Sequence, residues 1–253
     1  MASTLTWSVQ KIGKTESTQT VAANLANDGA AEGLVVVAEE QAVGKGRYGR
    51  SWLSPPGGLY MSLILRPKRP TGLPLLPIIA SFAILEGIEQ ETGVVTLMRW
   101  PNDVMLQGKK VAGVIAEASY RGETLSHVVV GMGINCNFRA ESLGELASSS
   151  TTLMDYLGRP VDLTGLRERI LSCLTPLYRD WSFGRAAVKI LESRGHISTI
   201  GKRVEVKLND GGIVVCRATN IDGNGSLIVE RDGHEALLRA EDVERLKELG
   251  EPA

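Results

Sequence analysis

The chain has 253 residues and a net charge of −1, with 43% hydrophobic and 23% charged residues, which is ordinary for a soluble globular protein. This balance predicts binding to neither nucleic acid nor a membrane surface, so basic residues must act locally. The N-terminus lacks the apolar core of a signal peptide, and no uninterrupted apolar run approaches the ~18 residues of a membrane span. We therefore expect a cytoplasmic protein with one large domain, or one large domain plus a small one.

The first two thirds of the chain alternate between helical and apolar β patterns. Ser17 or Thr18 can cap a helix in "STQTVAANLAND", and Pro77 and Gly93 suit the start and the end of a long apolar helix over 73–93. Strands are expected over 34–40, 59–65 and 94–100, in a hairpin that turns at Gly108, and in "TLSHVVVGMGINCN". Further helices are expected in "STTLMDYLG", "LTGLRERILSCLTPLYRDW" and "GRAAVKILESRG". The mixture predicts an α+β fold with a mixed sheet flanked by helices.

Short alternating strands, broken by "NDGG", "DGNG" and "RDG", follow Ile200. They predict a small antiparallel β-barrel of about 50 residues that ends in a short helix. The expected domains are residues 1–198 and 199–253.

The cysteines and histidines are scattered along the chain. There is no C-x-x-C and no pair of histidines at helical spacing, so we expect no disulfide framework and no protein-bound metal site. The six residues are Cys136, Cys173, Cys216, His127, His196 and His234.

The stretch "VGKGRYGRSW" contains the glycine spacing G-x-G-x-x-G, which also occurs in dinucleotide-binding turns. Such a turn needs a helix after the glycines, because the pyrophosphate binds the free N–H groups of the first turn. Pro55 and Pro56 follow closely and make a helix there improbable. A phosphate-binding loop at "GKT" also fails, because Ser8 stands where its first glycine is required.

Three basic residues alternate with the glycines of this stretch: Lys45, Arg47 and Arg50. The glycines make the loop flexible, and the charges allow it to gather around polyanionic groups. A solvated surface loop is the alternative interpretation.

The segment "RWPNDVMLQGKKVAGV" places polar groups at a strand end and a lysine at the start of an apolar strand. Asn102 and Asp103 can point into a cleft, and the Lys110 ammonium can stabilise charge on a carboxylate or phosphate. The alternative is an exposed ion pair in a hairpin. Further on, Gly131 and Gly133 leave room for a flat ring. Asn135 has the donor and acceptor that an adenine edge requires, unless the segment is a β-bulge and turn.

In this order, the motifs resemble those of the biotin protein ligase family. The motifs are "EST" (16–18), "EEQAVGKGRYGRSW" (39–52), "LYMS" (59–62), "RWPNDV" (99–104), "KVAG" (110–113) and "GMGIN" (131–135). The resemblance covers roughly residues 10 to 195, and the tail from Ile200 resembles the family's small SH3-like barrel. The family activates biotin with ATP and Mg²⁺ to biotinyl-5′-adenylate. It then transfers biotin to one lysine of an acceptor domain, usually in a biotin-dependent carboxylase.

The resemblance implies a role for each matching residue. Lys110, Arg47 and Asp103 would be catalytic. Biotin would contact Ser17, Thr18, Gln41, Arg47, Lys110 and Gly113. ATP or the adenylate would contact Lys45, Arg47, Arg50, Trp52, Asn102, Asp103 and Asn135. The chemistry agrees, because clustered cations relieve the repulsion between a carboxylate and a phosphate, and a closing loop protects the anhydride from water.

Two residues depart from the family pattern. Lys45 stands where the family usually has Arg, which replaces a bidentate phosphate contact by a point charge. Gln19 stands where Asn is common, and no role is assigned to it. Some members carry an N-terminal DNA-binding domain. Only some 15 residues precede Glu16, so DNA binding is not expected. A homodimer is allowed by the resemblance.

Three other functions remain as alternatives. The first is a lipoate ligase or acyltransferase on a related fold, which the basic loop argues against. The second is a non-catalytic ligand-binding module, which the intact set of Gln41, Arg47, Asp103 and Lys110 argues against. The third is a dehydrogenase.

Overall fold

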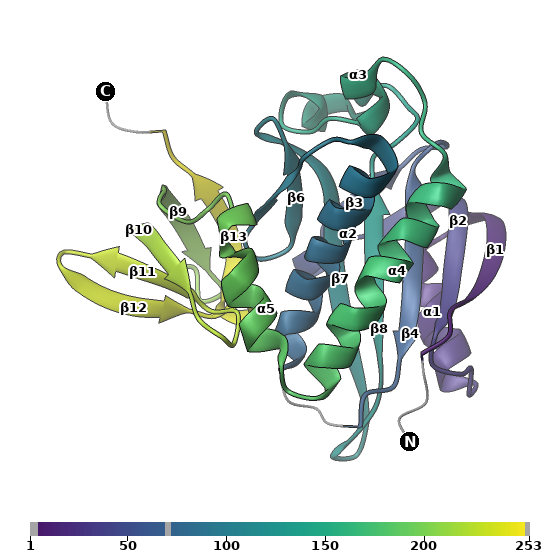
Figure 1. Cartoon of the computed structure of the whole chain (residues 1–253), viewed down its shortest axis with the longest axis horizontal. Coiled ribbons are helices and arrows are strands. Elements are labelled where there is room, and N and C mark those ends of the chain that lie inside the picture. The colour runs from purple at the N-terminus through teal and green to yellow at the C-terminus, as the bar shows by residue number, and fades with distance from the viewer. Residues whose placement is uncertain (1–4, 69–71, 251–253) are drawn as a thin grey trace.

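The computed structural model describes residues 5–68 and 72–250. Within them, eight strands form one large sheet and five strands form a second, smaller sheet (Figure 1). The large sheet contains β1 (Ser8–Thr15), β2 (Leu34–Lys45), β3 (Ser51–Ser54), β4 (Leu59–Leu65), β5 (Leu97–Arg99), β6 (Asp103–Leu106), β7 (Lys109–Arg121) and β8 (Thr124–Ile134). The α-helices are α1 (Thr18–Asn27), α2 (Leu76–Thr92), α3 (Leu153–Leu157), α4 (Leu163–Ser182) and α5 (Ala186–Glu192). The small sheet contains β9 (Arg203–Leu208), β10 (Ile213–Ile221), β11 (Leu227–Arg231), β12 (His234–Leu238) and β13 (Val243–Glu248).

The large sheet is mixed, as the sequence predicts. Its strand order is β1-β2-β4-β8-β7-β6-β5, with β3 paired to β2. β1 runs parallel to β2, whereas the other neighbouring pairs are antiparallel. The hairpin from β6 to β7 turns through Gln107 and Gly108, both with positive φ, which confirms the predicted turn.

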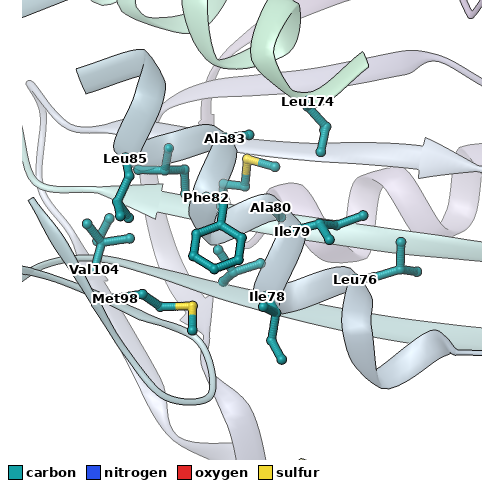
Figure 2. Close-up of a cluster of buried hydrophobic side chains, with 14 of the residues drawn as sticks. Leu76, Ile78, Ile79, Ala80, Phe82, Ala83, Leu85, Met98, Val104 and Leu174 are labelled. Atoms are coloured by element: carbon teal, nitrogen blue, oxygen red, sulfur yellow. The ribbon is translucent and has the colours of Figure 1, made fainter. Parts of the chain in front are cut away.

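The two faces of the large sheet are covered unequally. Figure 1 shows α2 and α4 side by side across one face. Alternate strand residues such as Leu63, Val130 and Val114 pack there with the apolar side chains of α2, part of which Figure 2 shows. The opposite alternation sends Ile64 and Val129 toward α1. Because α1 has only 10 residues, it covers only part of its face. Beyond the body of α1, this face carries Ser62, Gly131 and Gly133, and it forms the floor of a cavity.

Helix α2 is the centre of the core. It begins after a single 3-10 turn, has a proline in its first turn, and ends at Gly93 in the left-handed conformation, as predicted. Gly87 brings α2 close to α4, because a Cβ there would lie 2.5 Å from Ile170 Cγ1. By length and composition alone the stretch Leu73–Thr92 could span a membrane, but 67% of its most apolar window is buried inside the fold.

The small sheet is antiparallel, with the order β12-β11-β10-β9-β13. It stands beside the large sheet (Figure 1), and its strands lie in the part of the chain for which the SH3-like barrel is expected.

The predicted terminal helix is wrong, because the segment forms β13, which pairs with β9. Val243 is buried and Leu246 half-buried, so pairing and burial outweigh the helix-forming charged residues between them. The strand predicted over 94–100 is shorter and covers only Leu97–Arg99, because residues 94–96 form no regular structure and a turn begins at Trp100. The domain boundary at 198/199 stays a prediction.

Candidate functional site

A cavity of about 530 Å³ lies above the uncovered part of the large sheet. Its walls are the N-terminus of α1, the glycine-rich loop after β2, the hairpin from β6 to β7, and β13 of the small sheet. This volume suits a small-molecule site. Every predicted site residue except Asn135 lines it: Ser17, Thr18, Gln41, Lys45, Arg47, Arg50, Trp52, Asn102, Asp103, Lys110 and Gly113.

One end of the cavity is buried, polar and uncharged. Gln41 Oε1 accepts a hydrogen bond from the backbone N–H of Thr18 (2.8 Å) and lies 3.0 Å from the Thr18 hydroxyl, while Gln41 Nε2 donates to Ser54 Oγ at 2.8 Å. Ser17 occupies the N-cap position of α1, but its hydroxyl does not cap the helix. The Ser17 Oγ is buried and has no hydrogen-bond partner. Because an unpaired buried hydroxyl is costly, it is available to a ligand.

The indole ring of Trp52 covers the glycine floor. Gly113 and Gly133 are paired neighbours on β7 and β8, and a Cβ on Gly133 would lie 2.5 Å from Trp52 Nε1. A Cβ on Gly113 would lie 3.1 Å from the same ring. The flat ring above Gly133 is therefore Trp52 of the protein itself. Its Nε1 is buried without a partner, and the Lys110 ammonium lies 5.1 Å from the ring centroid.

Lys110 forms an ion pair with Asp103, and Asp103 lies between Lys110 and a second cation, Arg99. Lys110 Nζ lies 2.5 Å from Asp103 Oδ1, while Arg99 Nη2 donates to Asp103 Oδ2 at 2.6 Å. Burial alone would raise the pKa of Asp103, but the adjacent Lys110 and Arg99 charges hold that pKa below its usual value. The Asp103 side chain is 17% exposed and Lys110 is 27% exposed, so this is a half-buried cluster. The interpretation as an exposed hairpin ion pair is wrong.

The glycine-rich loop is fastened to the small sheet. Arg47 Nη2 donates to the carbonyl oxygens of Ala240 (2.6 Å) and Val243 (3.1 Å). Arg50 Nη2 donates to the Glu244 carbonyl at 2.9 Å. These contacts tie the loop to the segment that the sequence predicted as a helix.

The loop also contacts the hairpin and contains a strained residue. Arg47 Nη1 donates to Asn102 Oδ1 at 3.1 Å, and Asn102 Nδ2 donates to the Val114 carbonyl at 2.7 Å. Tyr48 has a φ of 55°, which is uncommon for a residue other than glycine. Lys45 is exposed at the mouth of the cavity.

Asn135 does not line the cavity. It is 3% exposed, and its Nδ2 donates to the Thr151 carbonyl at 3.1 Å, whereas its Oδ1 has no partner. Its role facing adenine stays a prediction.

Sequence reasoning missed several residues that line the cavity. They include Gln19, Ser62, Arg99, Arg245 and Lys247. Arg99 stands within the motif "RWPNDV", so its position beside Asp103 was a usable signal. Gln19 directly follows two predicted site residues. Nothing in the sequence pointed to Arg245 and Lys247 of β13, because only the tertiary fold brings that strand to the cavity.

The cysteines are buried and have high pKa values. Burial raises the pKa of the Cys136 thiol to about 12, and it also raises the pKa values of Cys173 and Cys216. Nothing in the geometry points to a thiol nucleophile. Across residues 5–68 and 72–250, no three His, Cys, Asp or Glu side chains are grouped as a metal site would require.

Taken together, the cavity joins an uncharged polar end to a strongly cationic end. Such a site can hold a neutral hydrogen-bonding head at one end and bring two anionic groups together at the other.

Comparison with known proteins agrees with this arrangement. Residues 12–135 match the biotin/lipoate A/B protein ligase family. The bifunctional ligase/repressor BirA of Bacillus subtilis is 35% identical over 232 residues, covering 90% of this chain and 71% of that protein. The biotin–[acetyl-CoA-carboxylase] ligase of Mycobacterium tuberculosis is 30% identical over 224 residues, covering 85% of this chain and 80% of that protein.

A solved structure extends the similarity to the whole fold. The biotin protein ligase of Aquifex aeolicus, in complex with biotin and ATP, superposes with a TM-score of 0.85 at 26% identity. The superposition covers 95% of this chain and 99% of that one.

Proposed function

This chain belongs to the biotin protein ligase family, and on that premise we propose that its cavity joins biotin to ATP and passes the biotinyl group to a protein lysine. The observation that carries the proposal is the two-ended cavity itself. Its buried end offers uncharged hydrogen-bonding groups, and Lys110 stands where that end meets the cations.

The polar end suits the fused urea ring of biotin. The Ser17 hydroxyl lacks a partner and can donate to the urea carbonyl, while Thr18 and Gln41 stand beside it. The valeryl chain of biotin then runs along Gly113 and Trp52 toward Lys110.

The cationic end supports formation of the adenylate. A biotin carboxylate oxygen attacks the α-phosphorus of ATP, a P–O bond forms, and pyrophosphate leaves. Both reactants are anionic, so Lys110, Arg47 and Arg50 lower the repulsion and stabilise the charge that develops in the transition state. Mg²⁺ accompanies ATP as part of the substrate. Asp103 keeps Lys110 in position.

The second half-reaction uses the same site. The neutral amine of the acceptor lysine attacks the biotinyl carbonyl carbon and an amide bond forms. The bond from that carbon to the anhydride oxygen breaks, AMP leaves with this oxygen, and the nitrogen releases one proton to water. The loop from Lys45 to Trp52 covers the adenylate between the two steps and excludes water. Because Lys45 offers a single point charge there, we expect it to hold the cover less firmly than an arginine at this position would.

The acceptor is the biotin-carrying domain of a biotin-dependent carboxylase, in keeping with the activity named for the Mycobacterium tuberculosis relative. A cytoplasmic location, a homodimer and the absence of DNA and membrane binding stay predictions.

Exchange of labelled pyrophosphate into ATP tests the first half-reaction. We expect exchange that depends on added biotin and that lipoate does not support. Folded protein that shows no biotin-dependent exchange would overturn the proposed function.

A further inference from the structure

Gln19 is a buried residue of the cavity to which no role has been assigned. It is 2% exposed and lies at the closed, polar end of the cavity. Its side chain fills the space above Gly131, where a Cβ would lie 2.6 Å from Gln19 Oε1. The bare backbone at Gly131 therefore makes room for Gln19.

The amide of Gln19 has only one orientation that satisfies its neighbours. Its Nε2 lies 2.9 Å from Glu117 Oε2 and 3.1 Å from the Val129 carbonyl, and both of these are acceptors. The Oε1 therefore faces Ser62, whose hydroxyl donates to it at 3.1 Å.

This orientation determines where the next protons point. The Ser62 hydroxyl has one hydrogen. Within the described residues it is the one donor to Gln19 Oε1, whereas Gln41 Oε1 already accepts from the Thr18 backbone N–H at 2.8 Å. The arrangement that leaves no buried acceptor without a donor therefore gives the Ser62 hydrogen to Gln19. Ser62 Oγ and Thr18 Oγ1 are 2.8 Å apart, so Thr18 must donate its own hydrogen to Ser62. The Thr18 hydroxyl then has no hydrogen left for Gln41 Oε1, which lies 3.0 Å away on its other side.

Two acceptor oxygens consequently face each other at the closed end of the cavity. Thr18 Oγ1 and Gln41 Oε1 both present lone pairs, an arrangement that an N–H donor placed between them would relieve. A ureido N–H of biotin is such a donor.

We propose that Gln19 is a specificity-determining residue that, through Ser62, commits the Thr18 proton and makes the closed end of the cavity an acceptor for a ureido N–H. The inference rests on the proposed function. Gln19 orients the Thr18 hydroxyl proton through one intermediate side chain, Ser62, and Glu117 fixes the Gln19 amide from the far side.

Kinetics of the variant Gln19→Met test this relay, because methionine has a similar length without the amide. We expect the KM for biotin in pyrophosphate exchange to rise about tenfold, with the KM for ATP unchanged and kcat within about threefold. Gln10→Met, on an exposed part of β1, is the matched control and should behave as the parent protein. An unchanged KM for biotin, or an equal rise in the KM for ATP, would overturn the inference.

A double-variant cycle separates the relay from a local packing effect. Ser62→Ala should raise the KM for biotin by a similar factor, and adding Gln19→Met to it should change little more. Multiplying effects would show that Gln19 acts independently of Ser62. Because Ser62→Ala removes only a hydroxyl, its predicted KM rise alone keeps the inference testable if Gln19→Met does not fold.

Desthiobiotin provides the last discrimination, because it keeps the urea and lacks the sulfur ring. Gln19→Met should raise the KM for desthiobiotin by the same factor as for biotin. If the KM rises for biotin but not for desthiobiotin, Gln19 acts by shaping the cavity around the sulfur ring, and the proposed relay is overturned. If the parent protein and Gln10→Met show no biotin-dependent exchange, the proposed function itself fails, which is a distinguishable result.

Discussion

Lys110 is the residue at which the uncharged and cationic ends of the cavity meet. Its ammonium lies against Asp103 and close to the ring of Trp52, so two side chains fix it from different sides. A flexible lysine held in this way loses little further freedom when the substrates bind, which is the advantage of a preorganised charge.

Replacing Lys110 by alanine should remove the charge that the adenylation step needs. We expect Lys110→Ala to lower the rate of biotin-dependent pyrophosphate exchange by about 10²–10³-fold. Biotin should still bind, because the polar end of the cavity is untouched, and calorimetric titration with biotin measures this. Lys109→Ala, at the exposed neighbouring position, is the control. Exchange at the parental rate would refute the role of Lys110.

Asp103 links stability to pH through its lowered pKa. Its ionised form is favoured in the folded protein, so its contribution is fully present above its unfolded pKa of about 4 and is lost as the pH falls through the lower folded pKa. Asp103→Asn should destabilise the protein by about 1–3 kcal/mol at pH 7. This difference should shrink at about pH 3.

Urea unfolding of both proteins at the two pH values measures the contribution of Asp103. Asp28→Asn, at an exposed position, is the matched control for the substitution itself. A parent-to-variant difference that grows with acidity would contradict the assigned cluster.

At the scale of elements, β7 and β8 shape the cavity because they have no side chains at Gly113 and Gly133. Their paired glycines at positions 113 and 133 let an indole ring lie flat on the sheet, whereas the alternate residues of the same strands pack under α2. One pair of strands therefore serves the core with one face and the ligand with the other.

A methyl group at position 133 should displace Trp52, because the new Cβ would lie 2.5 Å from Trp52 Nε1. We expect Gly133→Ala to keep its fold and to raise the KM for biotin about tenfold, as overpacking of roughly 1–2 kcal/mol implies. Gly13→Ala is the control, since a Cβ there meets nothing within 4 Å. A parental KM for biotin in Gly133→Ala would show that Trp52 moves without consequence for the ligand.

At the scale of the whole molecule, the small sheet serves as the anchor of the glycine-rich loop. Arg47 and Arg50 donate to backbone carbonyls of the segment from Ala240 to Glu244. Backbone acceptors depend on the path of the chain and not on side-chain identity. The small sheet therefore holds the loop over the cavity together with Asn102 of the hairpin.

Removing the Arg47 guanidinium should open the cover. We expect Arg47→Gly to release biotinyl-adenylate to solvent about tenfold faster, because the loop loses its contacts to both Asn102 and the small sheet. Chromatography of the free adenylate after a single turnover measures the leakage. Arg159→Gly, at an exposed position away from the cavity, is the control. Equal leakage from both variants would count against the loop as a cover.

Much of this protein follows from local sequence patterns. The hairpin at Gly108, the helix end at Gly93 and the apolar strands β4 and β8 are short-range features, because turn geometry and strand propensity act between near neighbours. Most of the residues predicted for the site line the cavity, since each motif keeps its residues within a few adjacent positions, and their roles stay predictions.

Only the tertiary structure decided the contacts between distant segments. The terminal segment looked helical by its charged residues, yet pairing with β9 makes it a strand that lines the cavity. Gln19 gained its role from Glu117 and Ser62, which lie 98 and 43 positions away along the chain. Asn135 turned out to donate to Thr151 outside the cavity. Propensity and motif spacing describe a residue and its neighbours, whereas burial and hydrogen-bond partners across the fold depend on how the sheets and helices pack.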